Sequence, residues 1–340
     1  MNLLYANNIS TTAGFARSSQ VRCNALAFKY HLNSKYSEVL IKPLKLGNRE
    51  FRLKESSLLR KAIFFCQVLY LITKCDWVYS RNLWLLVVLG VLTRKQLSWE
   101  MHDAPSRESL LKVVPKRLNI ICISQALESW LTGKGYCFKT MVAHDGISIK
   151  LWEKYSRITK NSHERMTVIH TGSAFPGRGL EILFELAKEN PDIDFHHFGG
   201  TEMQIDYWKK KYIFSPNAKL FPAVSKEEVM RVQRNADILL LPMTKKSPIW
   251  WCTSPMKLFE YMASETLIVH TGIGSITEVL SDENSVKIDI NNLARSFRTI
   301  IMDYENLISR GTKARQDVYN NYLWEIRTKK ILDFLNIPTN

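Results

Sequence analysis

The stretch Ile249–Glu265, IWWCTSPMKLFEYMASE, lies between two short apolar runs, Ile238–Pro242 (ILLLP) and Thr266–His270 (TLIVH). Short apolar runs of this length are typical of strands buried on both faces of a parallel sheet. Within the stretch, apolar side chains recur at helical spacing: Met256, Phe259 and Met262. The sequence therefore predicts a strand, a loop, a helix and a second strand, which is the repeating unit of a doubly wound α/β fold.

The predicted start of this helix is suited to bind an anion. Ser254 is a favoured N-cap residue and Pro255 a favoured first helical residue. The loop and the helix start would lie at the carboxyl end of a parallel strand, where doubly wound folds bind ligands. Unpaired N–H groups and the positive end of the helix dipole favour a phosphate there. Glu260 lies about one and a half turns further along and suits sugar hydroxyls better than phosphate.

The segment SPMKLFEYMA resembles the donor-site motif of glycosyltransferase family 4, the retaining nucleotide-sugar transferases of GT-B fold. That family carries two glutamates, eight residues apart, beside the donor. Glu260 matches the second, which the resemblance implies binds the nucleotide ribose, whereas Cys252 occupies the place of the first. The resemblance also places Ser254, Pro255 and Met256 at the donor. The alternative interpretation is an amphipathic helix with one solvated glutamate.

A glycine-rich loop, TGSAFPGRG at residues 171–179, connects a predicted strand over 166–170 to a predicted helix over 180–189. Its glycines let backbone approach a phosphate, and Arg178 adds a bidentate donor. Family 4 enzymes have G-R-x-x-x-x-K-G here, so Arg178 matches the lysine and Ser173 replaces the arginine. Lys257 is a substitute for that second cation, and the backbone N–H near Gly172 is a further donor. An ordinary turn remains the alternative.

Two candidates lie in the first half of the chain. Gly14 follows the predicted strand Leu3–Tyr5 in a loop that is no G-x-G-x-x-G. This loop resembles the first loop of family 4 enzymes, which implies that Gly14 and Arg17 lie near the donor phosphates or the acceptor. His102 ends a strand predicted over residues 97–103, and the resemblance implies a place near the donor sugar and the acceptor hydroxyl. The alternatives are an ordinary turn and a histidine bonded for structural reasons.

The formal charge of +15 is unevenly distributed. Residues 1–150 carry 22 Lys and Arg against 9 Asp and Glu, whereas residues 151–340 carry 25 against 23. A basic half implies an anionic partner, such as lipid headgroups, an acidic or pyrophosphate-linked acceptor, or nucleic acid. The basic and apolar mixture of residues 42–61 fits an anionic membrane surface or a solvated face. No nucleic-acid-binding module is recognisable, so we expect no nucleic-acid partner.

We expect neither a metal nor a cofactor in the chemical step. The D-x-D of Asp192 and Asp194 follows a predicted helix end, so a turn is favoured over a metal site. The six cysteines show no C-x-x-C spacing, which favours free thiols in a reducing compartment such as the cytoplasm. No stretch reaches the roughly 18 apolar residues of a membrane helix.

The order of elements predicts an α/β protein with two facing doubly wound (Rossmann-like) domains, the GT-B fold. We expect an acceptor-side domain over residues 1–150, a linker over 151–165 and a donor-binding domain over 166–320. The resemblance implies that residues 321–340 form a helix crossing back to the first domain. The expected function is retaining transfer of a sugar from a nucleoside-diphosphate sugar to a glycan or lipid-linked acceptor. A nucleotide-sugar epimerase of the same fold and a non-enzymatic nucleic-acid binder are the alternatives.

Overall fold

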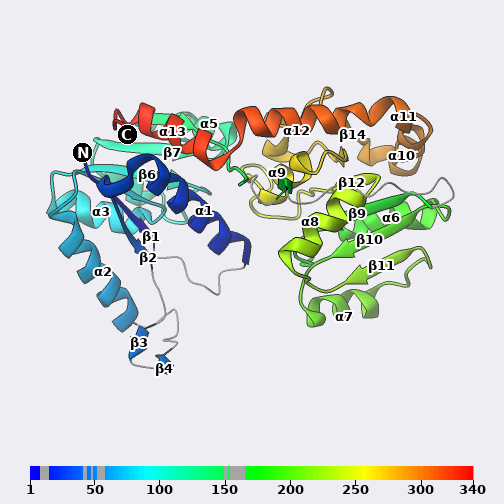
Figure 1. Cartoon of the computed structure of the whole chain (residues 1–340), viewed down its shortest axis with the longest axis horizontal. Coiled ribbons are helices and arrows are strands. Elements are labelled where there is room, and N and C mark those ends of the chain that lie inside the picture. Colours follow the sequence, from blue (N-terminus) through cyan, green and yellow to red (C-terminus); the bar gives the residue numbers. More distant parts are fainter. Residues whose placement is uncertain are drawn as a thin grey trace. The chain divides into compact units, whose positions relative to one another are not determined.

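The computed structural model describes residues 1–7, 15–40, 44–46, 49–51, 58–148, 152–153 and 165–339. The chain divides into two compact units (Figure 1). Unit 1 comprises Met1–Asp145 together with Trp324–Asn340, and unit 2 comprises Gly146–Leu323. Each unit has its own sheet, so each is described by itself.

Unit 1 contains a six-stranded parallel sheet in the order β2-β1-β5-β6-β7-β8. Its order reverses after β1, as in doubly wound sheets, where ligands bind at the carboxyl ends of the strands. The strands are β1 (Leu3–Asn7), β2 (Tyr36–Leu40), β5 (Trp77–Ser80), β6 (Gln96–Met101), β7 (Leu118–Cys122) and β8 (Lys139–Val142).

Helices from both ends of the chain cover one face of this sheet. The unit's helices are α1 (Phe15–Leu32), α2 (Leu58–Ile72), α3 (Leu83–Leu92), α4 (Ser109–Val113), α5 (Gln125–Gly133) and α13 (Trp324–Phe334). Side chains of α1 such as Phe28 and of α13 such as Ile331 join Tyr5 and Tyr79 of the sheet in one buried cluster. The last helix therefore completes the core of the first unit. The strands β3 (Leu44–Leu46) and β4 (Arg49–Phe51) pair antiparallel.

Unit 2 repeats this design with a second parallel sheet, ordered β11-β10-β9-β12-β13-β14. All four residues of its central strand, Ile238–Leu241, are buried, as the apolar run predicts. The strands are β9 (Thr167–Thr171), β10 (Asp194–Phe198), β11 (Ala218–Phe221), β12 (Ile238–Leu241), β13 (Leu267–His270) and β14 (Val286–Lys287).

Alternate residues of these strands pack against helices on opposite faces of the sheet. Leu240 joins a cluster with α6 and α10, whereas Leu239 and Leu241 join a cluster with α8, α9 and α12. The helices are α6 (Leu180–Glu189), α7 (Glu202–Lys211), α8 (Lys226–Asn235), α9 (Met256–Ala263), α10 (Leu293–Met302), α11 (Tyr304–Leu307) and α12 (Ser309–Asn321). Two doubly wound parallel sheets confirm the predicted fold class.

Three local expectations need correction. The N-cap of α9 is Pro255 in extended backbone, not Ser254, so the helix begins one residue later than its sequence suggests. Helix α7 was not expected, although its capping box of Thr201 and Gln204 is a helix-start signal. The apolar spacing of residues 291–308 predicts a single amphipathic helix, but the chain turns at Asp303 and continues into α11.

Some sequence expectations fall outside the described residues. These include Gly14, most of the predicted linker over 151–165 and much of the basic segment 42–61. Among the helices that the structure describes, none has the length and apolar character needed to span a membrane.

Candidate functional site

In unit 2, the loop between β9 and α6 is built on glycines with left-handed backbone. Gly172 has φ +131° and Gly179 has φ +89°. A Cβ on Gly179 would lie 1.8 Å from the carbonyl oxygen of Pro242, which follows β12. Only glycine permits both the conformation and this close approach, so the sequence of the loop determines its path.

A second glycine turn supports the first from the neighbouring strand. Gly199 follows β10 with φ +135°, and a Cβ there would lie 1.9 Å from the carbonyl oxygen of Gly172. The N–H of Gly172 donates to the carbonyl of Phe198 at 3.0 Å. The two strand ends therefore lie backbone against backbone, and Gly172 and Ser173 beyond them are exposed.

Lys257, in the first turn of α9, reaches this loop. Its Nζ donates to Nε2 of His170 at 2.8 Å and to the carbonyl oxygen of Thr171 at 3.3 Å. It also lies 3.5 Å from where a Cβ of Gly172 would be. Two regions that the sequence singled out, the glycine loop and the stretch before Glu265, are thus brought together within one unit.

This site carries two basic side chains, Lys257 and Arg178, and neither forms an ion pair with a carboxylate among the described residues. Burial lowers the pKa of Lys257 to about 7, Arg178 lowers it further, and Glu260 opposes them. Arg178 is half-buried in the same loop, and within the described residues its guanidinium forms no hydrogen bond or ion pair. An anion placed beside Gly172 would meet both cations.

Glu260 lies half-buried one turn after Lys257 on α9. Burial raises the pKa of Glu260, while Lys226, a hydrogen bond from Gln233 and Lys257 lower it. The following residue, Tyr261, is fully buried and accepts a hydrogen bond of 2.8 Å from the backbone N–H of Thr171. This bond fixes the helix that carries Lys257 and Glu260 against the glycine loop.

The remaining unit 2 candidates lie at the start of α9 and in the glycine loop. Ser254 is buried, Pro255 and Met256 are half-buried, and Ser173 is exposed. Met256 is the first residue of the helix, so its N–H has no intrahelical partner. Cys252 is buried, with its Sγ 3.8 Å from the carbonyl oxygen of Ile249.

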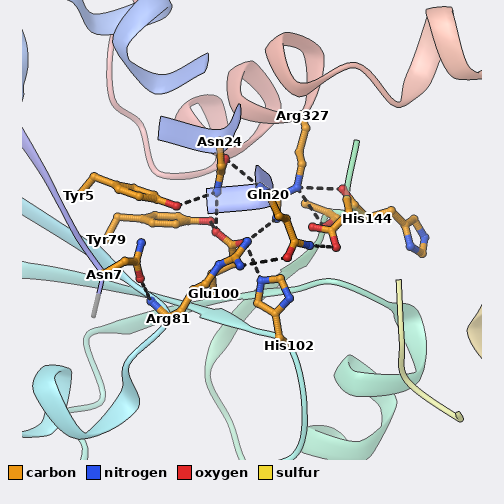
Figure 2. Close-up of polar contacts among 12 residues, drawn as sticks. Tyr5, Asn7, Gln20, Asn24, Tyr79, Arg81, Glu100, His102, His144 and Arg327 are labelled. Atoms are coloured by element: carbon orange, nitrogen blue, oxygen red, sulfur yellow. Dashed lines mark hydrogen bonds and ion pairs between the residues drawn. The ribbon is translucent and has the colours of Figure 1, made fainter. Parts of the chain in front are cut away.

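Unit 1 contains a different kind of polar cluster, centred on Glu100 of β6 (Figure 2). One carboxylate oxygen accepts from Asn24 Nδ2 at 2.7 Å and from Tyr79 Oη at 2.6 Å. The other accepts from Arg81 Nη2 at 2.7 Å and lies 3.4 Å from Arg327 Nη2 of α13. These arginines hold the pKa of Glu100 well below its usual range despite its burial.

His102 belongs to this cluster. Its Nε2 lies 2.7 Å from Oε1 of Glu100, and because a carboxylate only accepts, Nε2 carries the proton. Burial lowers the pKa of His102 to about 4, with Arg81 acting in the same direction. The imidazole is therefore neutral at neutral pH, and its Nδ1 keeps a lone pair.

Glu100, His102 and Asp145 together offer three possible metal ligands within 4.8 Å. Two guanidiniums already occupy the carboxylate of Glu100, which favours an ion-pair network over a cation site. Burial raises the pKa of Asp145 to about 7, and Gln20 Nε2 donates to its carboxyl group.

The D-x-D residues form one exposed and one partly exposed ion pair. Asp192 lies 3.0 Å from Arg298, and Asp194, the first residue of β10, lies 3.3 Å from Arg165. These contacts agree with the turn that the sequence favours.

Sequence reasoning missed the side chains that support these sites. His170 and His197 lie beneath Lys257, on neighbouring strands and in register. The signal was present, because each of these histidines comes two residues before a glycine that ends its strand. In unit 1, Glu100 was visible only as a lone charge within an apolar strand.

Two doubly wound units, each built on a parallel sheet, define the GT-B fold. Solved structures with this fold cover nearly the whole chain. Sucrose-phosphate synthase from Thermosynechococcus elongatus is 14% identical with a TM-score of 0.75, covering 99% of this chain and 98% of that one. Alr3699/HepE of Anabaena, in complex with UDP, is 18% identical with a TM-score of 0.72, covering 99% and 100%. A glycosyltransferase from Rickettsia africae is 14% identical with a TM-score of 0.69, covering 98% and 97%.

The family comparison supplies the class of activity. Residues 153–317 match the family described as glycosyl transferases group 1, a range that contains the glycine loop and α9. This match and the GT-B fold of the chain together support a transferase enzyme of the glycosyltransferase class. No curated protein sequence matches the chain.

Proposed function

We propose that this glycosyltransferase moves a sugar from a nucleoside-diphosphate sugar to a glycan or lipid-linked acceptor, with retention of configuration as in family 4. The observation that carries the proposal is Lys257, a cation without a carboxylate ion pair among the described residues, held 3.3 Å from the carbonyl of Thr171 beside the open Gly172 turn. Burying positive charge is costly unless an anion compensates it.

In this proposal the diphosphate lies at the glycine loop. Lys257, Arg178 and the backbone N–H groups near Gly172 and Ser254 neutralise the charge that develops on the leaving group, which is usually the largest contribution that such a site makes. The start of α9 at Pro255 and Met256 adds the positive end of a helix dipole. Glu260, further along the same helix, accepts hydrogen bonds from the ribose hydroxyls.

The donor class is supported by a structural neighbour, because the Anabaena protein was solved with UDP and with UDP-glucose. We further propose that Gly14 lies near the donor phosphates or the acceptor, and that His102 lies near the donor sugar and the acceptor hydroxyl. A neutral imidazole whose Nε2–H is bound to Glu100 presents a hydrogen-bond acceptor to a hydroxyl group. An anionic membrane surface, contacted by the basic segment 42–61, is the proposed location of a lipid-linked acceptor.

The test is Glu260→Gln, which keeps the shape of the side chain but removes its charge. Hydrogen bonds to a charged group contribute about 1.5–3 kcal/mol, so we expect a roughly 10–100-fold loss of affinity. Free nucleoside diphosphate should lose as much as the sugar nucleotide, because the contact is to ribose. Calorimetric titration measures both, with Glu202→Gln at the exposed start of α7 as the matched control.

Wild-type affinity in a folded Glu260→Gln variant would contradict the ribose assignment. Product analysis then separates transfer from epimerisation, because an epimerase converts the sugar nucleotide without releasing nucleoside diphosphate.

A further inference from the structure

A continuous line of hydrogen bonds runs beneath the glycine loop of unit 2, from Lys257 to the backbone of Gly199. Lys257 Nζ lies 2.8 Å from His170 Nε2, and His170 Nδ1 lies 2.9 Å from His197 Nδ1. His197 Nε2 lies 3.1 Å from the carbonyl oxygen of Gly199. The two rings are stacked, with centroids 5.0 Å apart, and both are fully buried.

The last acceptor fixes the direction of this line. A carbonyl oxygen only accepts, so His197 Nε2 carries a proton. Burial lowers the pKa of His197 to about 4 and that of His170 well below its usual range, so both rings are neutral. His197 Nδ1 then accepts, His170 Nδ1 donates to it, and His170 Nε2 presents its lone pair to Lys257.

This arrangement determines which donors of Lys257 remain for a ligand. An ammonium has three donors, and His170 Nε2 and the carbonyl of Thr171 accept from Lys257. One N–H is left for an anion at the Gly172 turn.

The other charges around Lys257 come from three elements. Arg178 on the β9–α6 loop disfavours the ammonium, Glu260 on α9 favours it, and Lys226 on α8 acts on Glu260. His170 on β9 and His197 on β10 carry no charge at neutral pH, because the pKa of each imidazole is lowered. An anionic ligand would therefore be the largest stabilising charge that this lysine meets.

We propose that His170 and His197 are positioning residues that hold Lys257 as a proton-accepting anchor, so that binding of the donor diphosphate takes up one proton from solvent onto Lys257. The proton adds to the lone pair of the amine, and no covalent bond to the ligand forms. This inference rests on the proposed function, because it requires an anion at the glycine loop.

The pH dependence follows from linkage. In the free protein the pKa of Lys257 is about 7, and a bound diphosphate raises it. Below that pH the lysine is already charged, so binding takes up no proton. Above it, uptake approaches one proton, and affinity falls by about tenfold per pH unit.

The experiment is calorimetric titration with UDP-glucose at pH 6, 7 and 8, in buffers of different ionisation enthalpy. A sugar nucleotide is used because its phosphates, both diesters, do not titrate in this range. We expect uptake of about zero, one half and nearly one proton per ligand bound. Binding at pH 8 without proton uptake would overturn the inference and leave the proposed function intact.

Variants of the histidine pair separate positioning from folding. His170→Leu removes the acceptor for Lys257, so we expect proton uptake to move to lower pH. Affinity at pH 7 should fall roughly tenfold, because about one hydrogen bond to a charged group is lost. His170→Gln supplies an amide oxygen and should restore most of that affinity. The matched control is His196→Gln, since His196 is adjacent on β10 and packs on Phe221 instead. Equal effects of His170→Leu and His170→Gln would contradict the positioning role.

The hydrogen-bond direction is tested without any ligand. Imidazole nitrogen NMR of the free protein should show the Nδ1–H tautomer for His170 and the Nε2–H tautomer for His197, both neutral at pH 6. The opposite tautomers, or a charged ring, would overturn the inference. If UDP-glucose and the ADP-, GDP- and dTDP-glucose analogues all fail to bind, the proton linkage falls together with the proposed function, whatever the tautomers.

Discussion

Both units bury positive charge beside a parallel sheet, and they compensate it in opposite ways. In unit 1, Arg81 and Arg327 surround Glu100, which accepts hydrogen bonds from both sides and has a pKa far below its usual range. In unit 2, Lys257 has hydrogen-bond partners that are all neutral, and its pKa is lowered to about 7.

The contrast separates a structural cluster from a binding site. Charges that satisfy one another hold elements together, and here they join α13 to the sheet of the first unit. A cation whose hydrogen-bond partners are all neutral costs stability in the free protein and gains a closer counter-charge from a ligand. The same chain thus uses buried charge for folding in one unit and, in our proposal, for donor binding in the other.

The largest expected effect is on the stability of unit 1. Glu100→Gln leaves two buried guanidiniums without their carboxylate, and breaking a buried pair in this way costs about 3–5 kcal/mol. Urea unfolding, with hydrogen exchange of the β1, β5 and β6 amides, measures it. Glu108→Gln is the control, because its pair with Lys134 is exposed and is expected to contribute at most about 1 kcal/mol. Equal losses in the two variants would remove the distinction between the clusters.

A smaller effect is expected at the phosphate end of unit 2. Arg178→Ala should weaken nucleoside diphosphate by roughly 10–100-fold, the range of one lost charge-assisted contact, and monophosphate far less. Arg231→Ala, which loses only an exposed pair with Glu228, should change neither. A loss of the same size for both nucleotides would place Arg178 away from the outer phosphate.

The smallest expected effect is that of metal removal. If cations of the protein neutralise the leaving group, excess EDTA should leave the transfer rate unchanged. Asp194→Asn should be nearly neutral as well, since Asp194 makes only a partly exposed ion pair. Complete loss of activity, restored by Mg²⁺ or Mn²⁺, would contradict a metal-free step.

Sequence alone could predict much of the fold, because buried strands such as Ile238–Leu241 are continuous apolar runs and glycine turns mark their ends. The candidate loop of Gly172 and the helix of Lys257 were identified in the same way. Their supporting groups were not, since the contact between His170 and His197 depends on the register of two neighbouring strands, which the histidine-to-glycine spacing that they share does not fix.

Long-range pairing also explains the other omissions. Glu100 is bonded by residues from the first and last helices of the chain, so its role depends on contacts far apart in sequence. Helix α9 begins at Met256 and not at Pro255, a shift of one residue that propensity does not resolve.

The central claim is that Lys257 is held for an anionic ligand and not for folding, and Lys257→Met tests it most directly. Methionine keeps the length of the side chain and removes the charge. The measurement is the thermal midpoint of the free protein together with calorimetric affinity for nucleoside diphosphate. We predict a midpoint equal to or above that of the wild type, and an affinity lower by roughly 10–100-fold. A midpoint that falls as far as that of Glu100→Gln, with unchanged nucleotide affinity, would contradict the claim.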